Sequence, residues 1–251
     1  SLVVSSIQEL TGSWRQAGMW HTVFMLLTVL VVSRGVERGL ERAVTLMVPA
    51  LIGILLILLG YSVISGEFLR AVEFLFRPDF SAIDGSIILA AMGQAFFTLS
   101  IGMCTVMAYG AYLPQEASIV GTAAAVVSAD TGIALLSGLV IFPIVFANGL
   151  DPSSGPDLIF QALPLSFGNM PGGQLFGTLF FVLVSFAALT SAISLMEPAV
   201  AWAVEVTSLS RARASVYIGV TIWLLGWLSV LSFNVLKDFK FWRGTFMDNF
   251  D

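Results

Sequence analysis

The chain has 251 residues, of which 57% are hydrophobic and 11% are charged, with a formal net charge of -5. Soluble domains carry about 25% charged residues, so this composition excludes an ordinary soluble protein and indicates an integral membrane protein. With one cysteine (Cys104) and one histidine (His21, expected to be a packing residue), the chain also lacks the residues for a disulfide framework, a thiolate metal cluster or a histidine-based membrane enzyme.

Six apolar segments are long enough to cross a bilayer, which takes about 20 residues of helix. We therefore predict an all-α, polytopic protein, a single transmembrane domain over residues 1–251. The predicted spans are 17–33, 44–64, 86–113, 117–147, 175–204 and 214–233. The connectors 65–85 and 148–173 are predicted to be loops, and Pro49 predicts a kink in the second span.

Arginines near the ends of the spans predict the orientation. Arg34, Arg38 and Arg42 lie between the first two spans, and Arg211 and Arg213 lie between the last two. Alternating spans put both connectors on the same side, and the excess of arginine makes that side cytoplasmic.

The third span contains a polar stretch at its centre, GQAFFTLSIGM over Gly93–Met103. Gly102 disfavours helix, and the hydroxyls of Thr98 and Ser100 compete for backbone hydrogen bonds. We predict a helix broken at about Thr98–Gly102, which would present carbonyls, hydroxyls and two half-helix ends to a ligand. The alternative is that these small polar residues form a helix–helix contact.

Two further polar sites lie inside predicted spans. Asp130, in AVVSADTGIALL, has no lysine or arginine partner in any span, so a bound cation fits, although a carboxylate hydrated from the cytoplasmic side is the alternative. In FAALTSAISLMEP, one helical face carries Ala187, Thr190, Ser191 and Leu195. Their hard oxygens suit an alkali cation, whereas a plain helix contact is the alternative. Glu197, on the same helix, receives no role.

Four stretches resemble the neurotransmitter:sodium symporters, and in particular bacterial amino-acid members that share the leucine-transporter fold. They are GQAFFTLSIGM (93–103), RGVERGLER (34–42), GPDLIFQALPLSFGNMPGG (155–173) and FAALTSAISLMEP (186–198). The resemblance implies part of an inverted-repeat core with a discontinuous helix, covering helices four to nine and the start of helix ten.

The resemblance also implies roles for individual residues. The substrate would contact Phe97, Thr98, Ser100, Met103, Ser191 and Leu195. A first sodium would bind Thr98 and Asp130, and a second would bind Ala187, Thr190 and Ser191. The gate positions match Gln94, Glu205 and Asp251.

Two departures from the family pattern make the expectation more specific. Asp130 stands where the family has an asparagine, and Ala134 stands where chloride-dependent relatives have a serine, so we predict chloride-independent transport with Asp130 supplying the negative charge. Met103 replaces an aromatic residue found in many relatives, and its flexible side chain predicts a pocket that accepts several hydrophobic side chains.

The resulting prediction is a sodium-coupled symporter that imports a neutral, hydrophobic or aromatic amino acid by alternating access. We expect a protein that is not an enzyme, that binds no nucleic acid or organic cofactor, and that lies in the inner membrane of a bacterium. The resemblance also allows a homodimer. The resemblance implies that the sodium and substrate sites are completed by family helices one and three, which we expect to lie outside this chain. An inactive or incomplete fragment is therefore one alternative, and a channel or another small-molecule carrier is the other.

Overall fold

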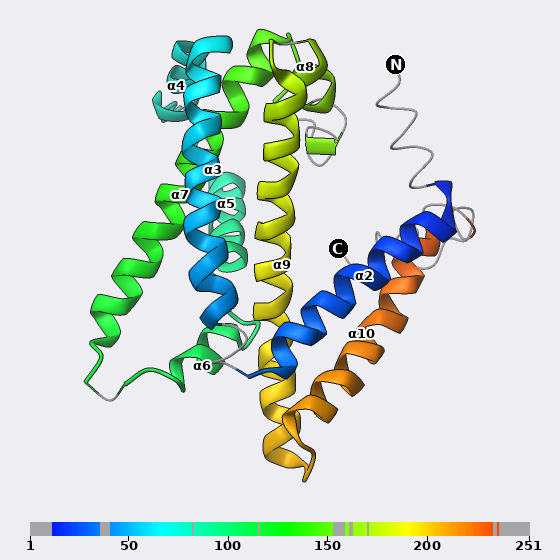
Figure 1. The fold of residues 1–251 in the computed structure, drawn as a ribbon. Coiled ribbons are helices and arrows are strands. Elements are labelled where there is room, and N and C mark those ends of the chain that lie inside the picture. Colours follow the sequence, from blue (N-terminus) through cyan, green and yellow to red (C-terminus); the bar gives the residue numbers. More distant parts are fainter. Residues whose placement is uncertain are drawn as a thin grey trace. The chain divides into compact units, whose positions relative to one another are not determined.

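The computed structural model describes residues 12–35, 41–81, 83–114, 116–152, 159–160, 163–169, 171–232 and 235, and the regular structure within these residues is helical. Figure 1 shows the elements. They are α2 (Trp14–Ser33), α3 (Glu41–Ser65), α4 (Phe68–Phe76), α5 (Gly85–Thr98), α6 (Thr105–Gly110), α7 (Ile119–Ala147), α8 (Leu163–Asn169), α9 (Gly173–Val206) and α10 (Arg211–Ser232). The predicted all-α class is confirmed.

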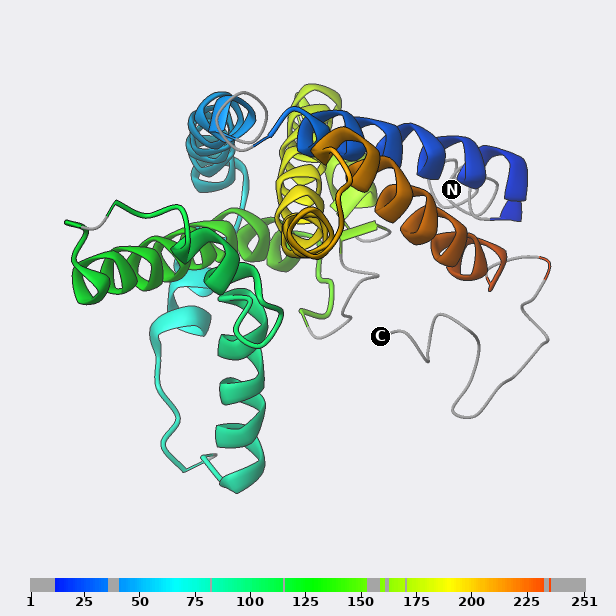
Figure 2. The ribbon, with the colours of Figure 1, turned by 90° about the horizontal axis from the view of Figure 1, so that it is seen from below.

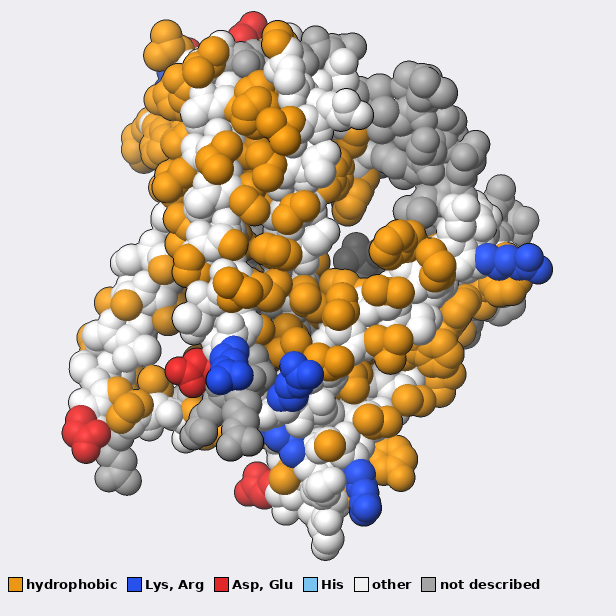
Figure 3. Space-filling view, viewed as in Figure 1, with side chains coloured by type: hydrophobic (Ala, Val, Ile, Leu, Met, Phe, Trp, Pro, Cys, Tyr) orange, Lys and Arg blue, Asp and Glu red, His pale blue; other side chains and the backbone are white. Residues whose placement is uncertain are grey.

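Five of these helices are long and apolar enough to cross a membrane: α2, α3, α7, α9 and α10. The third predicted span is divided between α5 and α6, and α5 alone has only 14 residues. Large apolar side chains stay exposed on these helices, as Figure 3 shows on the face turned to the viewer. Such exposure fits helices that face lipid or further protein.

Helices α4 and α8 correct the prediction that their connectors are loops. In α4, Ala71 is buried, Leu75 packs over Gly138 of α7, and Phe74 meets the ring of Phe142 edge-on at 4.9 Å between centroids. In α8, Leu163 and Phe167 are buried one turn apart. Both segments are too short to span a bilayer, and each helix has an apolar face that binds it to the longer helices.

The chain divides into two compact units. The first comprises residues Ser1–Val48 and Phe186–Asp251, and within it α2 and α10 lie side by side (Figures 1 and 2). A Cβ on Gly18 would lie 2.1 Å from the Trp227 ring, and one on Gly226 would lie 2.4 Å from the His21 ring. The glycines therefore let the two helices approach closely, as small residues do in membrane proteins.

Polar side chains add to this contact. The Trp223 indole N–H donates to Thr22 Oγ1 at 3.0 Å, and His21 Nε2 lies 3.1 Å from the Trp223 carbonyl oxygen. His21 is thus a packing residue, as its position in an apolar run suggests. The apolar core of this unit joins α2, α9 and α10 through Val32, Ile193, Met196, Val200, Ala203 and Ala214.

The second unit comprises Pro49–Ser185. Its core gathers side chains from α3, α7, α8 and the first turns of α9, and the Tyr61 ring stacks on Phe176 at 3.9 Å. Gly173 is required at the start of α9, because a Cβ there would lie 1.6 Å from the Phe167 carbonyl oxygen, which is a backbone atom.

A proline in α7 is compensated by a serine in α3. Pro143 lacks an N–H, so the Leu139 carbonyl has no donor from its own helix. The buried Ser62 hydroxyl lies 2.9 Å from the Val140 carbonyl oxygen and 3.4 Å from that of Leu139. The shorter contact goes to Val140, so the longer contact to Leu139 only partly replaces the hydrogen bond that the proline removes.

We expect Ser62→Ala to lower the free energy of unfolding by about 1 kcal/mol, because it removes the hydroxyl that contacts the Val140 carbonyl and the part-buried Leu139 carbonyl. Unfolding in detergent micelles would measure this. The matched control is Ser185→Ala, since the exposed Ser185 hydroxyl donates only within its own helix, to Phe181 at 2.7 Å. Pro143→Ala restores the missing N–H, so Ser62→Ala should cost less stability in a Pro143→Ala protein. An equally large loss there would contradict the compensating role of Ser62.

Candidate functional site

The third predicted span is broken, as the sequence predicts. Helix α5 ends at Thr98 in a Schellman motif: the Ile101 N–H donates to the Phe96 carbonyl at 2.9 Å and the Ser100 N–H to the Phe97 carbonyl at 3.0 Å. Helix α6 begins only at Thr105. The non-helical stretch 99–104 thus starts one residue later than predicted and extends two residues further.

The backbone of this stretch is left-handed at alternate residues. Ser100 has φ 53°, Gly102 has φ 88° and Cys104 has φ 60°. Two of the three carry a side chain, and each such residue costs on the order of 1–3 kcal/mol. Strain of this kind gathers at functional sites, which favours a ligand-binding role over a plain helix contact.

The predicted substrate residues of this stretch are largely accessible. The Phe97 side chain is 70% exposed, Met103 is 37% exposed, Thr98 is exposed and Ser100 is half-buried. Gln94, the predicted outer-gate residue, is exposed one turn before Thr98 on α5. The break therefore presents two hydroxyls and two large apolar side chains.

Asp130 lies in α7 and belongs to the same unit as the break. It is half-buried, and no basic side chain in the described part of the chain pairs with it. No hydrogen bond joins it to Thr98, the other predicted ligand of the first sodium. Both oxygen groups remain available to a cation.

The second predicted cluster lies on α9, in the unit that contains α2 and α10. The Thr190 hydroxyl donates to the Ala187 carbonyl at 2.9 Å and to the Phe186 carbonyl at 3.0 Å. Because the hydroxyl proton is used in this way, the lone pairs of Thr190 stay free to accept a cation. Ser191 and Leu195 are exposed, Leu195 by 50%. This set offers hard oxygens in adjacent positions.

The other two predicted gate residues lie in the C-terminal part of the chain. Glu205 is exposed near the end of α9. Asp251 lies outside the described residues.

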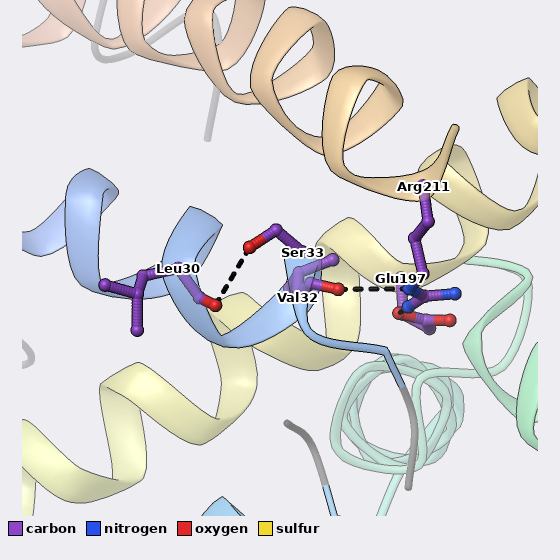
Figure 4. A network of polar contacts seen from close by, with 5 residues as sticks. All are labelled: Leu30, Val32, Ser33, Glu197 and Arg211. Atoms are coloured by element: carbon purple, nitrogen blue, oxygen red, sulfur yellow. Dashed lines mark hydrogen bonds and ion pairs between the residues drawn. The ribbon is translucent and has the colours of Figure 1, made fainter. Parts of the chain in front are cut away.

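The structure adds an ion pair that sequence reasoning missed. Glu197 of α9 is fully buried, and it pairs with Arg211, which is the first residue of α10 rather than part of the connector (Figure 4). Arg211 Nε also donates to the Val32 carbonyl at the end of α2, at 3.1 Å. The sequence offered only a glutamate inside a predicted span and an arginine 14 residues later.

Asp84 caps the start of α5 and carries a testable pH dependence. Its carboxylate accepts from the Ile87 N–H at 2.9 Å and from the Ser86 hydroxyl at 2.7 Å, and these bonds, the first most of all, hold the pKa of Asp84 below its ordinary value of 3.8. A carboxylate whose pKa is lower in the folded state stabilises above its ordinary pKa, and that stability is lost as the pH falls through the lowered value.

We therefore expect the first turn of α5 to loosen in acid in the unmodified chain. Asp84→Asn, which keeps an acceptor oxygen without the titration, should show no such loosening. Amide hydrogen exchange at Ile87, compared between the two proteins from about pH 5 down to pH 2, measures the difference. Identical profiles would contradict the role of the charge.

Comparisons with known proteins identify the family and the fold of the chain. A family model described as the sodium:neurotransmitter symporter family matches residues 3–237. An uncharacterized sodium-dependent transporter of Bacillus subtilis, YhdH, is 41% identical over 90% of this chain and 50% of its own length. One of Haemophilus influenzae is 31% identical over 91% of the chain and 50% of its own length. The chain spans about half the length of these relatives.

Among solved structures, the crystal structure of MhsT in complex with L-phenylalanine matches with a TM-score of 0.85 and 39% identity, over 97% of this chain and 56% of that one. Together with the five apolar helices, these relatives identify an integral, multi-pass membrane protein with the leucine-transporter type of fold. The bacterial relatives indicate a bacterial inner membrane.

Proposed function

Because the chain belongs to the sodium:neurotransmitter symporter family, we propose that it forms the helix-four-to-nine part of a sodium-coupled symporter that imports a neutral amino acid by alternating access. The observation that carries the proposal is the break between α5 and α6, with left-handed backbone angles at Ser100, Gly102 and Cys104. Five helices long enough to cross a membrane, in a chain that also contains such a break, support a carrier.

The break supplies complementary charge to an amino acid and its coupling ion. The carbonyl end of α5 is electronegative and suits a cation, whereas the N–H end of α6 is electropositive and suits a carboxylate. Thr98 and Asp130, from α5 and α7 of one unit, would hold the first sodium. Sodium is carried with the substrate here rather than retained.

The second sodium would bind the oxygens of Ala187, Thr190 and Ser191. The hydrogen bond between the Thr190 hydroxyl and the Ala187 carbonyl keeps these two oxygens adjacent, which supports a shared ligand. Hard oxygen ligands are those that alkali cations prefer.

The proposed substrate is hydrophobic or aromatic. Met103, at the break, has an unbranched side chain that adapts to different partners, and Phe97 beside it provides a large apolar surface. That MhsT was solved in complex with L-phenylalanine supports a substrate of this size. By the family resemblance, Ser191 and Leu195 complete the contacts, and transport is chloride-independent because Asp130 supplies the charge.

Uptake by the intact protein in proteoliposomes tests the proposal. Labelled leucine and tryptophan should enter with an inward sodium gradient and not with potassium, at the same rate after chloride is replaced by gluconate. Uptake that needs no sodium for either amino acid would contradict the proposal. Conductance without accumulation would favour a channel. Sodium-dependent binding of substrate to the isolated chain would argue against an inactive fragment.

A further inference from the structure

Polar side chains on α9 continue beyond the second sodium cluster toward the cytoplasmic end. Thr190, Ser194 and Glu197 follow at i, i+4 and i+7, which places them on one helical face, and Glu205 comes two turns later. At 1.5 Å per residue, Glu197 lies about 10 Å and Glu205 about 22 Å from Thr190 along the axis. Ionisable residues inside a membrane helix commonly mark ion routes.

Glu197 and Glu205 differ in their access to water. Glu197 is 0% exposed, whereas Glu205 is exposed. The Arg211 side chain, 24% exposed, pairs with Glu197 from the start of α10, as Figure 4 shows. The guanidinium is therefore partly open to solvent, whereas the carboxylate that it pairs with is not.

Building on the proposed function, we propose that Glu197 is a cation-binding station on the route by which sodium leaves the second cluster for the cytoplasm. Arg211 is the tethered cation that occupies this carboxylate whenever sodium is absent. The reason is electrostatic. A buried carboxylate needs a positive partner, so it cannot be left alone. Two cations at one carboxylate repel each other, so sodium and the guanidinium bind in turn.

The position of Arg211 suits this exchange. Its guanidinium reaches inward from a helix start, and its partly exposed head can return to water along a flexible stem. Its Nε donates to the Val32 carbonyl, one of the last carbonyls of α2, which gives the side chain a defined resting position.

A purely structural clamp is the competing interpretation, because Arg211 also ties α2, α9 and α10 together. The two interpretations predict different changes in the response to internal sodium. If the pair is a clamp, removing either partner should change that response in the same direction. If Glu197 binds sodium, the two changes should act in opposite directions. Removing Arg211 removes the competitor of sodium, whereas removing the Glu197 charge removes the binding site.

The experiment follows sodium-driven uptake by the intact protein in proteoliposomes while internal sodium is titrated. We expect Arg211→Gln to lower the half-inhibiting internal sodium concentration by about tenfold or more, and Glu197→Gln to raise it by about tenfold or more. Arg213→Gln, a neighbouring exposed arginine, is the matched control and should stay within about twofold. Shifts of both variants in the same direction, or in neither, would overturn the proposal.

Two further measurements guard against a misfolded variant and against failure of the underlying function. In detergent, sodium but not potassium should raise the melting temperature of Arg211→Gln more than that of the unmodified protein, because sodium no longer competes with the guanidinium for Glu197. The double variant Glu197→Gln/Arg211→Gln leaves no unpaired charge and should respond as Glu197→Gln does. If the unmodified protein lacks sodium-driven uptake, the proposed function fails. If it has uptake and all variants respond alike, only this inference fails.

Discussion

Replacing Asp130 with alanine is expected to lower sodium-driven uptake by roughly 100-fold or more, because the change removes both a ligand and the negative charge of the proposed first sodium site. The half-buried carboxylate pairs with no basic side chain in the described part of the chain, so its removal leaves no basic side chain there without a partner. Initial rates in proteoliposomes measure the effect, with melting temperature as the control for folding. Uptake that survives the change would keep the family and remove the role of Asp130.

Asp130→Asn separates the two contributions. An amide oxygen can still ligate sodium, so we expect a loss of about tenfold rather than 100-fold. Adding Ala134→Ser to this variant supplies a hydroxyl one turn further along α7, where an anion could restore the missing charge. Chloride should then stimulate uptake in the double variant and not in the unmodified protein. Chloride dependence of the unmodified protein would contradict the assigned charge.

The break in the third span was predictable because its signals are local. Gly102 and the hydroxyls of Thr98 and Ser100 weaken the helix through their own backbone preferences, which a sequence displays directly. Its extent was not predictable. Ser100 and Cys104 adopt left-handed backbone angles that residues with side chains rarely choose, so their residue types did not indicate these angles.

The ion pair was missed for a different reason. Arg211 is the first residue of α10 and follows directly on the connector, so the pattern of apolar residues assigns it to the loop. Its pairing with Glu197 depends on how α9 and α10 pack, which periodicity does not reveal. Helices α4 and α8 escaped prediction because short apolar segments between longer spans resemble the buried parts of loops. The roles of individual site residues rest on the resemblance and stay predictions.

Breaking the Glu197–Arg211 pair from one side is expected to have the largest effect on stability. Arg211→Met should lower the free energy of unfolding by about 3–5 kcal/mol, because it removes the guanidinium that pairs with the fully buried Glu197 carboxylate. Glu197→Leu should lower it by less, because the partly exposed Arg211 guanidinium can return to water. The double variant should regain most of the loss, since two apolar side chains of similar volume fit beside Met196 and Val200 in the same core.

Unfolding in mixed micelles, analysed as a double-mutant cycle, gives the coupling between the two residues directly. Losses that simply add would mean that the two charges do not depend on each other, contrary to the buried geometry. A restored double variant has a second use, because it separates stability from transport. If the pair only holds α2, α9 and α10 together, this variant should transport with the internal-sodium response of the unmodified protein. If Glu197 is a station for sodium, the variant should be stable and yet lose that response.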